Sequence, residues 1–186
     1  MSVSEESLLE DSLVGLSWLR EKVGPQTDIL VFAHSLGTAL AARTLAQDRS
    51  PVSGLILMSP FNNFLDEVLS KFNQTSSWIK YGLWSMVSGL SGESIPRFLL
   101  RKLDIEFRTD DHLLSVEAPV LVLHAEDDDK IPVELARKLV EDLSSSGKTN
   151  LELHVYDGSA GYKHHDIYKD PDLPALILRF TSGEGK

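Results

Sequence analysis

A serine stands at the centre of the residues that could carry out chemistry in this chain. Ser35 follows a short apolar run, residues 28–33, and precedes an alanine-rich segment, residues 38–47. A buried strand, a tight turn that bears a serine and a helix together form the context of a nucleophile elbow, usually written G-x-S-x-G. Here Ala33 replaces the first glycine and Gly37 is the second. We expect small residues at both positions because larger side chains would collide in so sharp a turn.

Carboxylates and histidines later in the chain are the other groups that a serine nucleophile needs. Residues 126–129 are all acidic and follow a second apolar run, and His164 and His165 follow a third. A serine requires a base that takes its proton and a carboxylate that fixes the tautomer of the imidazole. Either later group alone is commonly a solvated turn or a surface loop. Three groups in the order serine, acid, histidine favour a catalytic site.

The elements that must position these groups follow from hydrophobic patterning. Short buried runs predict parallel strands, and amphipathic or alanine-rich segments predict the helices between them. Alternating strands and helices indicate an α/β fold with about four parallel strands and flanking helices. In such sheets the chemistry lies at the carboxyl ends of the strands. The predicted strands are residues 28–33, 54–58, 119–124 and 151–156, and the predicted helices are residues 4–23, 38–47, 132–143 and 174–180.

A long insertion separates the second predicted strand from the third. Residues 61–118 contain most of the aromatic side chains of the chain. Connections of this length are usually functional lids or carry helices of their own. We therefore weigh two interpretations, a cap that forms an apolar substrate pocket and a helical excursion that packs on the core. In either case residues 1–186 form a single domain with this insertion.

Composition excludes several classes of function. The net charge of −10 argues against nucleic acid as a partner. The absence of cysteine excludes disulfides and thiolate catalysis. No apolar run has the length of a membrane span, and no secretory signal is visible at the start. We interpret the remaining histidines as structural and expect no metal site, because no pair has a spacing such as H-E-x-x-H: His34, His112, His124 and His154.

Four motifs carry a resemblance to a known family. The elbow at residues 33–37, the Ser-Pro-Phe-Asn of residues 59–62, the Leu-His-Ala-Glu-Asp-Asp of residues 123–128 and the Gly-Tyr-Lys-His of residues 161–164 together resemble the α/β-hydrolase fold. Within that fold they are similar to the membrane-associated monoacylglycerol and lysophosphatidylserine lipases. The resemblance extends from about Leu8 to Phe180.

The resemblance implies a set of site residues and an activity. It makes Ser35 the nucleophile, His164 the base and Asp128 the acid, with Asp127 and Asp129 as weaker candidates for the acid. The backbone N–H of Leu36 is the implied oxyanion donor. The implied activity is hydrolysis of carboxylic esters of long-chain acyl lipids through an acyl-enzyme, without a cofactor or metal. Because the implied substrate is a lipid ester, we expect the protein to associate with a membrane surface through that substrate. The resemblance suggests the endoplasmic reticulum membrane for a full-length form.

The chain departs from this family before the elbow. Only 34 residues precede Ser35, whereas the family places four strands there and takes a second oxyanion donor from the loop after its third strand. We therefore expect the C-terminal part of the fold, as a splice form, an incomplete gene model or a shortened chain, with full activity dependent on the absent strands. The strand before Ser35 would then have an unpaired edge. Two alternatives stay open: a non-catalytic fragment that binds a partner through that edge, and a thioesterase or peptidase of the same fold.

Overall fold

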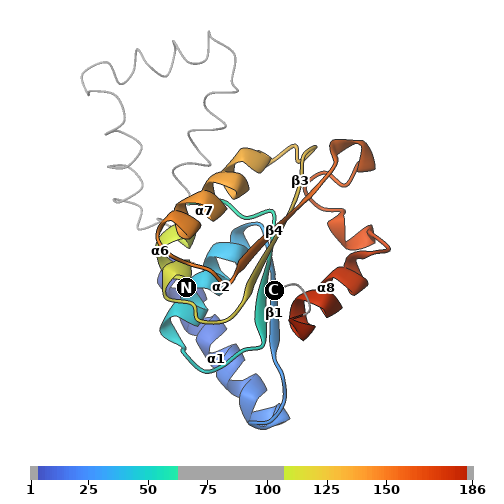
Figure 1. The fold of residues 1–186 in the computed structure, drawn as a ribbon. Coiled ribbons are helices and arrows are strands. Elements are labelled where there is room, and N and C mark those ends of the chain that lie inside the picture. Colours follow the sequence, from blue (N-terminus) through green and yellow to red (C-terminus); the bar gives the residue numbers. More distant parts are fainter. Residues whose placement is uncertain (1–3, 63–106, 184–186) are drawn as a thin grey trace, which may run out of the picture.

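The computed structural model describes residues 4–62 and 107–183, which form an α/β structure around one sheet (Figure 1). The sheet is parallel throughout, with the strands in the order β1-β2-β3-β4. The predicted α/β fold with about four parallel strands is therefore confirmed. The strands are β1 (Leu30–His34), β2 (Gly54–Met58), β3 (Val120–Ala125) and β4 (Leu151–Tyr156).

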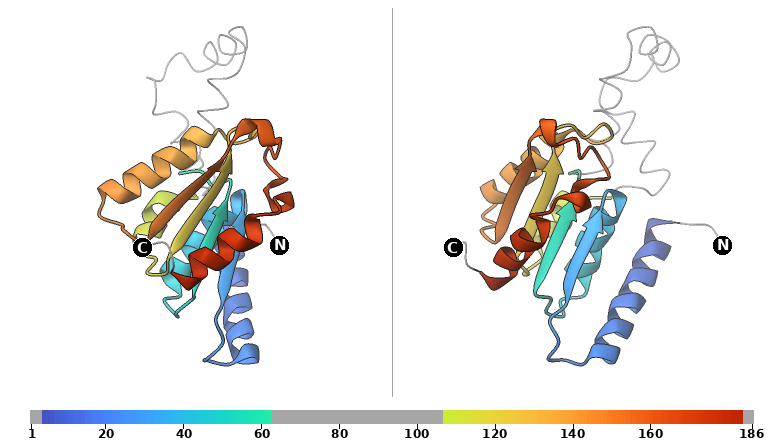
Figure 2. Two further views of the ribbon diagram at one scale, coloured as in Figure 1. Left: turned by 45° about the vertical axis from the view of Figure 1, so that its right-hand side comes forward. Right: turned by 90° about the vertical axis from the view of Figure 1, so that its right-hand side faces the viewer.

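Helices cover both faces of this sheet, as the two views of Figure 2 show. Ser4 caps the first helix through a capping box, and Gly24 closes it with a positive φ of 82°. No helix within the described ranges is long and apolar enough to cross a membrane. The helices are α1 (Glu5–Val23), α2 (Leu36–Gln47), α6 (Thr109–Leu114), α7 (Val133–Ser145) and α8 (Leu173–Ser182), with short 3₁₀ turns η1 (Gly158–Ala160) and η2 (Ile167–Lys169).

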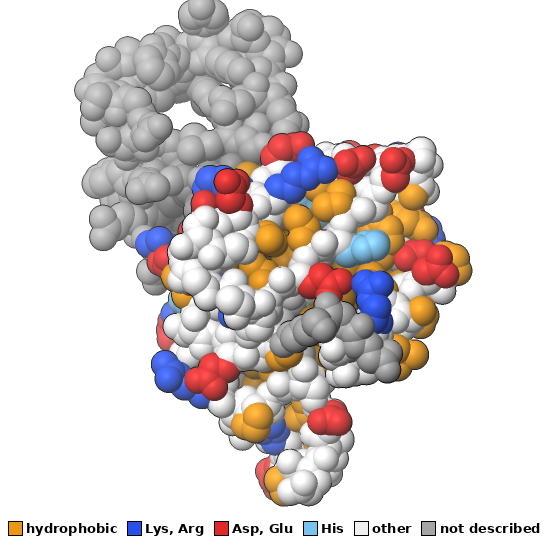
Figure 3. Space-filling view, in the orientation of Figure 1, with side chains coloured by type: hydrophobic (Ala, Val, Ile, Leu, Met, Phe, Trp, Pro, Cys, Tyr) orange, Lys and Arg blue, Asp and Glu red, His pale blue; other side chains and the backbone are white. Residues whose placement is uncertain are grey.

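The hydrophobic core has a layer on each side of the sheet because strand side chains alternate between the faces. On one face, alternate residues of β2 and β3 pack against α2, α6 and α7. On the other face, the intervening residues pack against α8 and η2. Every residue of β2 and β3 is buried, so these two strands form the centre of the core. Figure 3 shows one face of the molecule, where hydrophobic side chains gather in the middle with a histidine among them and charged side chains around them.

β1 is an edge strand with one open side. Ser35 donates its N–H to Met58 O, and Ser53 donates its N–H to Ile29 O. Residues 29 and 35 therefore direct their backbone groups toward β2. Because successive residues of a strand direct these groups to opposite sides, residues 30, 32 and 34 direct their N–H and C=O groups away from β2. No strand among the described residues pairs with that side. Phe32, 44% exposed, lies on this open strand.

The predicted insertion, residues 61–118, is described only at its two ends. Phe61 and Phe107 are buried in a small cluster between α2 and α7, together with Ala39, Ile131 and Leu135. Beyond Phe107, α6 places the buried side chain of Leu113 in the core. This end therefore packs as part of the main domain. The remainder of the expected cap, residues 63–106, and its substrate pocket lie outside the described residues.

Candidate active site

Ser35 occupies a sharp turn between β1 and α2. Its backbone has φ 54° and ψ −124°, a conformation that residues other than glycine rarely adopt. Three hydrogen bonds hold this conformation: Ser35 N–H donates to Met58 O, and the N–H and hydroxyl of Thr38 both donate to Ser35 O. A strained serine at the junction of a parallel strand and a helix is the geometry of a nucleophile elbow.

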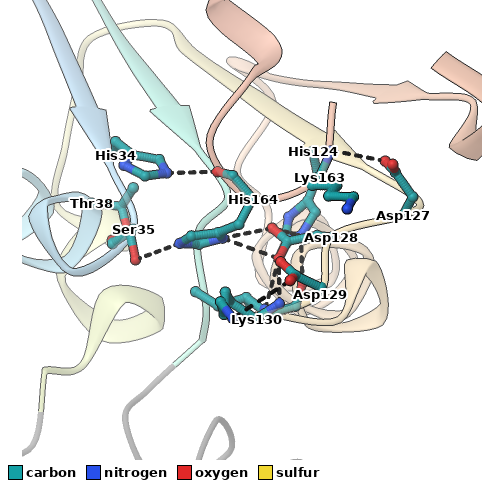
Figure 4. A network of polar contacts seen from close by, with 11 residues as sticks. His34, Ser35, Thr38, His124, Asp127, Asp128, Asp129, Lys130, Lys163 and His164 are labelled. Atoms are coloured by element: carbon teal, nitrogen blue, oxygen red, sulfur yellow. Dashed lines mark hydrogen bonds and ion pairs between the residues drawn. The ribbon is translucent and has the colours of Figure 1, made fainter. Parts of the chain in front are cut away.

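His164 lies between Ser35 and Asp128 (Figure 4). Its Nε2 is 3.0 Å from Ser35 Oγ, and its Nδ1 is 2.8 Å from Asp128 Oδ2 and 3.1 Å from Oδ1. The side chain of His164 is 4% exposed. Since a carboxylate only accepts hydrogen bonds, Nδ1 carries a proton, and the neutral imidazole presents a lone pair at Nε2 to the serine hydroxyl. The arrangement can move a proton from Ser35 to His164.

The carboxylate of Asp128 is fully buried and ionised. Burial by itself raises the pKa of this carboxyl, but hydrogen bonds outweigh it and hold the pKa far below the ordinary value. Those bonds come from His124 and His164 and from the N–H groups of Ile131 and Lys130, which both donate to Oδ1. Asp128 is thus a negative charge that is fixed in place beside His164.

The acidic neighbours of Asp128 have different roles in the structure. Asp127 accepts a hydrogen bond from the Lys163 N–H at 3.1 Å, and so ties the histidine-bearing loop to the turn after β3. Glu126 accepts one from the Gly158 N–H of the same loop. Asp129 forms an exposed ion pair with Lys130. Of the three candidates for the acid, Asp128 is the one that the structure brings to the imidazole.

His34 and His124, both interpreted from the sequence as structural, contact this constellation. His34 Nε2–H donates to the backbone carbonyl of His164 at 2.8 Å, and burial lowers the pKa of the His34 imidazole. His124 is fully buried, with Nε2 3.3 Å from Asp128 Oδ2 and 2.9 Å from Ile131 O. The signal that could have identified both is sequence proximity, because His34 precedes Ser35 and His124 lies four residues before Asp128.

Leu36, the expected oxyanion donor, is the first residue of α2. The first N–H groups of a helix have no acceptor within the helix, so this one is available to a ligand beside Ser35. We expected a small residue to be required at position 37, but the described residues leave room there for a larger side chain. Among the described residues, nothing lies within 4 Å of the position that a Cβ would occupy there.

Comparison with known families places most of the chain in one group. Residues 4–113 match the family described as serine aminopeptidase, S33. The match includes the elbow and ends before β3, so it covers the serine but not the acidic turn or the histidine loop.

Curated relatives match almost the whole chain. A lysophosphatidylserine lipase ABHD12 of Danio rerio is 32% identical over 96% of this chain and 46% of its own length. The same lipase of Mus musculus is 29% identical over 95% of the chain and 44% of its length, and protein ABHD12B of Homo sapiens is 29% identical over 96% and 48%. The chain thus spans about half the length of these relatives.

Solved structures share the fold at low sequence identity. An esterase of Pyrococcus furiosus superposes with a TM-score of 0.61 at 21% identity, covering 94% of this chain and 61% of the esterase. A monoacylglycerol lipase of Paleococcus ferrophilus gives a TM-score of 0.53 at 17% identity, covering 94% of this chain and 75% of the lipase. These neighbours establish the α/β-hydrolase fold, as the sequence motifs predicted.

Proposed function

The chain belongs to the serine aminopeptidase S33 family of α/β hydrolases, and from that premise we propose that it is the catalytic part of a serine hydrolase of long-chain acyl lipid esters. The observation that carries the proposal is the continuous hydrogen-bonded series from Ser35 Oγ through His164 to Asp128. A nucleophile, a base and an orienting carboxylate connected in this way are the requirements of acyl transfer through serine.

The proposed reaction proceeds through an acyl-enzyme. Ser35 Oγ attacks the ester carbonyl carbon while its proton passes to His164 Nε2. The negative charge that forms on the carbonyl oxygen accepts a hydrogen bond from the Leu36 N–H. His164 then gives the proton to the departing alcohol, and the C–O bond of the ester breaks. A water molecule repeats the sequence on the acyl-enzyme and releases the fatty acid and free Ser35.

The burial of Asp128 supports its role in this reaction. Its carboxylate fixes the proton of His164 on Nδ1 and stabilises the imidazolium that forms when Ser35 attacks. The charge is held by backbone N–H groups and by His124 and is shielded from water. It therefore requires little rearrangement during the reaction, which is the property that makes electrostatic stabilisation effective.

The proposed substrate class rests on the relatives. Two of the relatives that match almost all of this chain, those of Danio rerio and Mus musculus, are named lysophosphatidylserine lipases, and a structural neighbour is a monoacylglycerol lipase. Both names describe esters of a single acyl chain and a polar alcohol. The competing substrates within this fold are thioesters and peptides, which the same three residues can also cleave.

Full activity is proposed to need a second oxyanion donor. In this fold that donor comes from a loop ahead of the elbow strand, and β1 is the first strand of the described residues. Loss of one such donor lowers kcat by about 10²–10³-fold. We therefore expect slow turnover of the 186-residue chain and faster turnover of a form that carries the additional strands.

The substrate assignment is tested on the purified chain with two lipid esters of equal acyl chain length, and with an aminoacyl amide and an acyl thioester as the competing substrates. The proposal predicts release of fatty acid from 1-acyl lysophosphatidylserine and from monoacylglycerol, and loss of that release in Ser35→Ala. Cleavage of an aminoacyl amide or a thioester in preference to both lipid esters would contradict the substrate class while leaving the serine mechanism intact.

A second candidate function is association of two copies through β1. The observation that favours it is the side of β1 with which no strand among the described residues pairs, on a strand where Phe32 and Leu30 are 44% and 36% exposed. An exposed apolar edge strand is a template for pairing with another strand. A chain that is monomeric at high concentration and hydrolyses esters would exclude this candidate.

A further inference from the structure

Three imidazoles lie together beside Ser35. His34 comes from the end of β1, and His164 and His165 come from the loop after β4. One ring nitrogen of each lies within 4.8 Å of the others, and the ring centroids are 4.7 to 5.4 Å apart. Within residues 4–62 and 107–183, this is the one group of three or more side chains that could hold a metal ion.

We propose that His34, His164 and His165 form a Zn²⁺ site that withdraws His164 from Ser35 and so inhibits the hydrolase. The inhibition rests on the proposed function, whereas the binding of the metal does not. The sequence predicted no metal site because no two histidines have a helical ligand spacing. The fold creates the group because the loop that follows β4, at one edge of the sheet, reaches the end of β1 at the other edge.

His164 already has the arrangement of a metal-binding histidine. Its Nδ1–H donates to Asp128, which leaves the lone pair on Nε2. Histidine ligands of zinc commonly donate their second N–H to a carboxylate in this way, and the carboxylate fixes the ring and makes it a better ligand. The interaction that prepares His164 to accept the proton of Ser35 therefore also prepares it to bind zinc.

His34 is held in a similar manner by a carbonyl. Its Nε2–H donates to His164 O at 2.8 Å, so the lone pair of the neutral ring lies on Nδ1. His34 can bind the ion through Nδ1, or through Nε2 after it gives up that hydrogen bond. Either mode keeps the ligand on β1, beside the elbow.

His165 gives the site an entrance and the necessary freedom of movement. Its side chain is exposed, whereas His164 is buried and His34 is half-buried. Zn–N distances of 2.0–2.1 Å in a tetrahedral site require ligand nitrogens about 3.3 Å apart, closer than the 4.8 Å limit seen here. Rotation of the exposed ring of His165 shortens its distances to the other two ligands, and the rings of His34 and His164 must approach each other as well. Three imidazoles favour zinc over magnesium or calcium, which prefer oxygen ligands.

Metal binding and base catalysis compete for one lone pair. Ser35 Oγ lies 3.0 Å from His164 Nε2, and that nitrogen cannot accept the proton of Ser35 while it is bound to zinc. The fourth position of the ion is filled by water or by Ser35 Oγ itself. In both cases the serine loses its base.

The site is tested by titrating Zn²⁺ into the full chain carrying Ser35→Ala, with the heat of binding as the readout. We expect one-to-one binding, weakened at least about tenfold by His165→Gln or by His34→Gln in the same background. The matched control is His112→Gln, on α6, which should bind zinc as the Ser35→Ala chain does. Unchanged affinity in both His165→Gln and His34→Gln, or equal loss in His112→Gln, overturns the site.

Inhibition is tested on the chain that retains Ser35, with a fluorophosphonate probe of the serine. Saturating Zn²⁺ should suppress labelling, and a chelator should restore it. Labelling that persists while calorimetry shows the site to be occupied overturns the inhibition. If the chain is unlabelled even without zinc, the proposed function fails, and the calorimetry of the Ser35→Ala chain still decides the metal site.

Discussion

The hydroxyl of Ser35 lies 3.0 Å from Nε2 of His164, although the two residues are 129 positions apart in the sequence. They also follow the two outermost strands of the sheet, β1 and β4. The loop that bears His164 must therefore cross the carboxyl ends of β2 and β3. Asp127 holds this loop at the turn after β3, and His34 holds it at β1. The geometry of the site depends on both attachments.

The rate of ester hydrolysis should depend far more on the charge of Asp128 than on the charge of Asp127. Asp128→Asn keeps the acceptor for the Ile131 and Lys130 N–H groups but no longer fixes the His164 proton on Nδ1. We expect ester hydrolysis to fall by about 10⁴-fold, the cost of presenting the wrong tautomer to the serine. Steady-state kinetics on a soluble ester measures this.

Asp127→Asn is the matched control for Asp128→Asn. Its amide oxygen can still accept from the Lys163 N–H, so the loop keeps its attachment and the rate should change by less than about threefold. Equal losses in the two variants, with both chains folded by circular dichroism, would show that the acidic turn acts through loop position rather than through the charge on Asp128.

Gly37 and Gly54 should respond in opposite ways to alanine. At Gly37 a Cβ meets nothing within 4 Å among the described residues, so Gly37→Ala should stabilise α2 by about 0.4–1 kcal/mol. At Gly54 a Cβ would lie 2.8 Å from Phe180 Cε1 and 3.0 Å from Leu30 Cδ1, so Gly54→Ala should destabilise the chain by about 1–3 kcal/mol. Denaturant unfolding compares the two. If Gly37→Ala instead destabilises the chain, a small residue is required at position 37, as the elbow pattern suggested.

A positive charge on the open strand should reduce self-association. Phe32→Lys places lysine on the exposed edge of β1, where charge opposes strand pairing. The control is Val14→Lys on α1, which adds the same charge to a side chain that is 69% exposed. Sedimentation velocity over a range of concentrations should show a shift toward monomer in Phe32→Lys alone. The same shift in both variants would indicate a general effect of charge and not pairing through β1.

Most of the fold could be predicted from the sequence because its strands are short, apolar and bounded by breakers. The predicted strands at residues 54–58 and 151–156 coincide with β2 and β4, and the other two begin or end within about two residues of β1 and β3. α6 was not predicted. Its six residues are too short to show a helical period and lie in the segment interpreted as a cap.

The site was harder to predict because its supporting contacts depend on tertiary structure. The order serine, acid, histidine left residues 126–129 and both His164 and His165 open, and the family resemblance chose Asp128 and His164, which the structure brings into hydrogen-bonding distance of each other and of Ser35. The contact of His34 with His164 O depends on how far a loop from the opposite edge of the sheet extends. Neither hydrophobic period nor residue spacing carries that information.

Covalent labelling of Ser35 tests the central claim most directly. The chain is treated with a fluorophosphonate probe, and the modified peptide is identified by mass spectrometry, with Ser35→Ala as the test variant and Ser182→Ala, at the exposed end of α8, as the control. The account predicts a probe adduct on Ser35, no labelling of Ser35→Ala and unchanged labelling of Ser182→Ala. A folded chain that stays unlabelled, or an adduct that persists in Ser35→Ala, would contradict it.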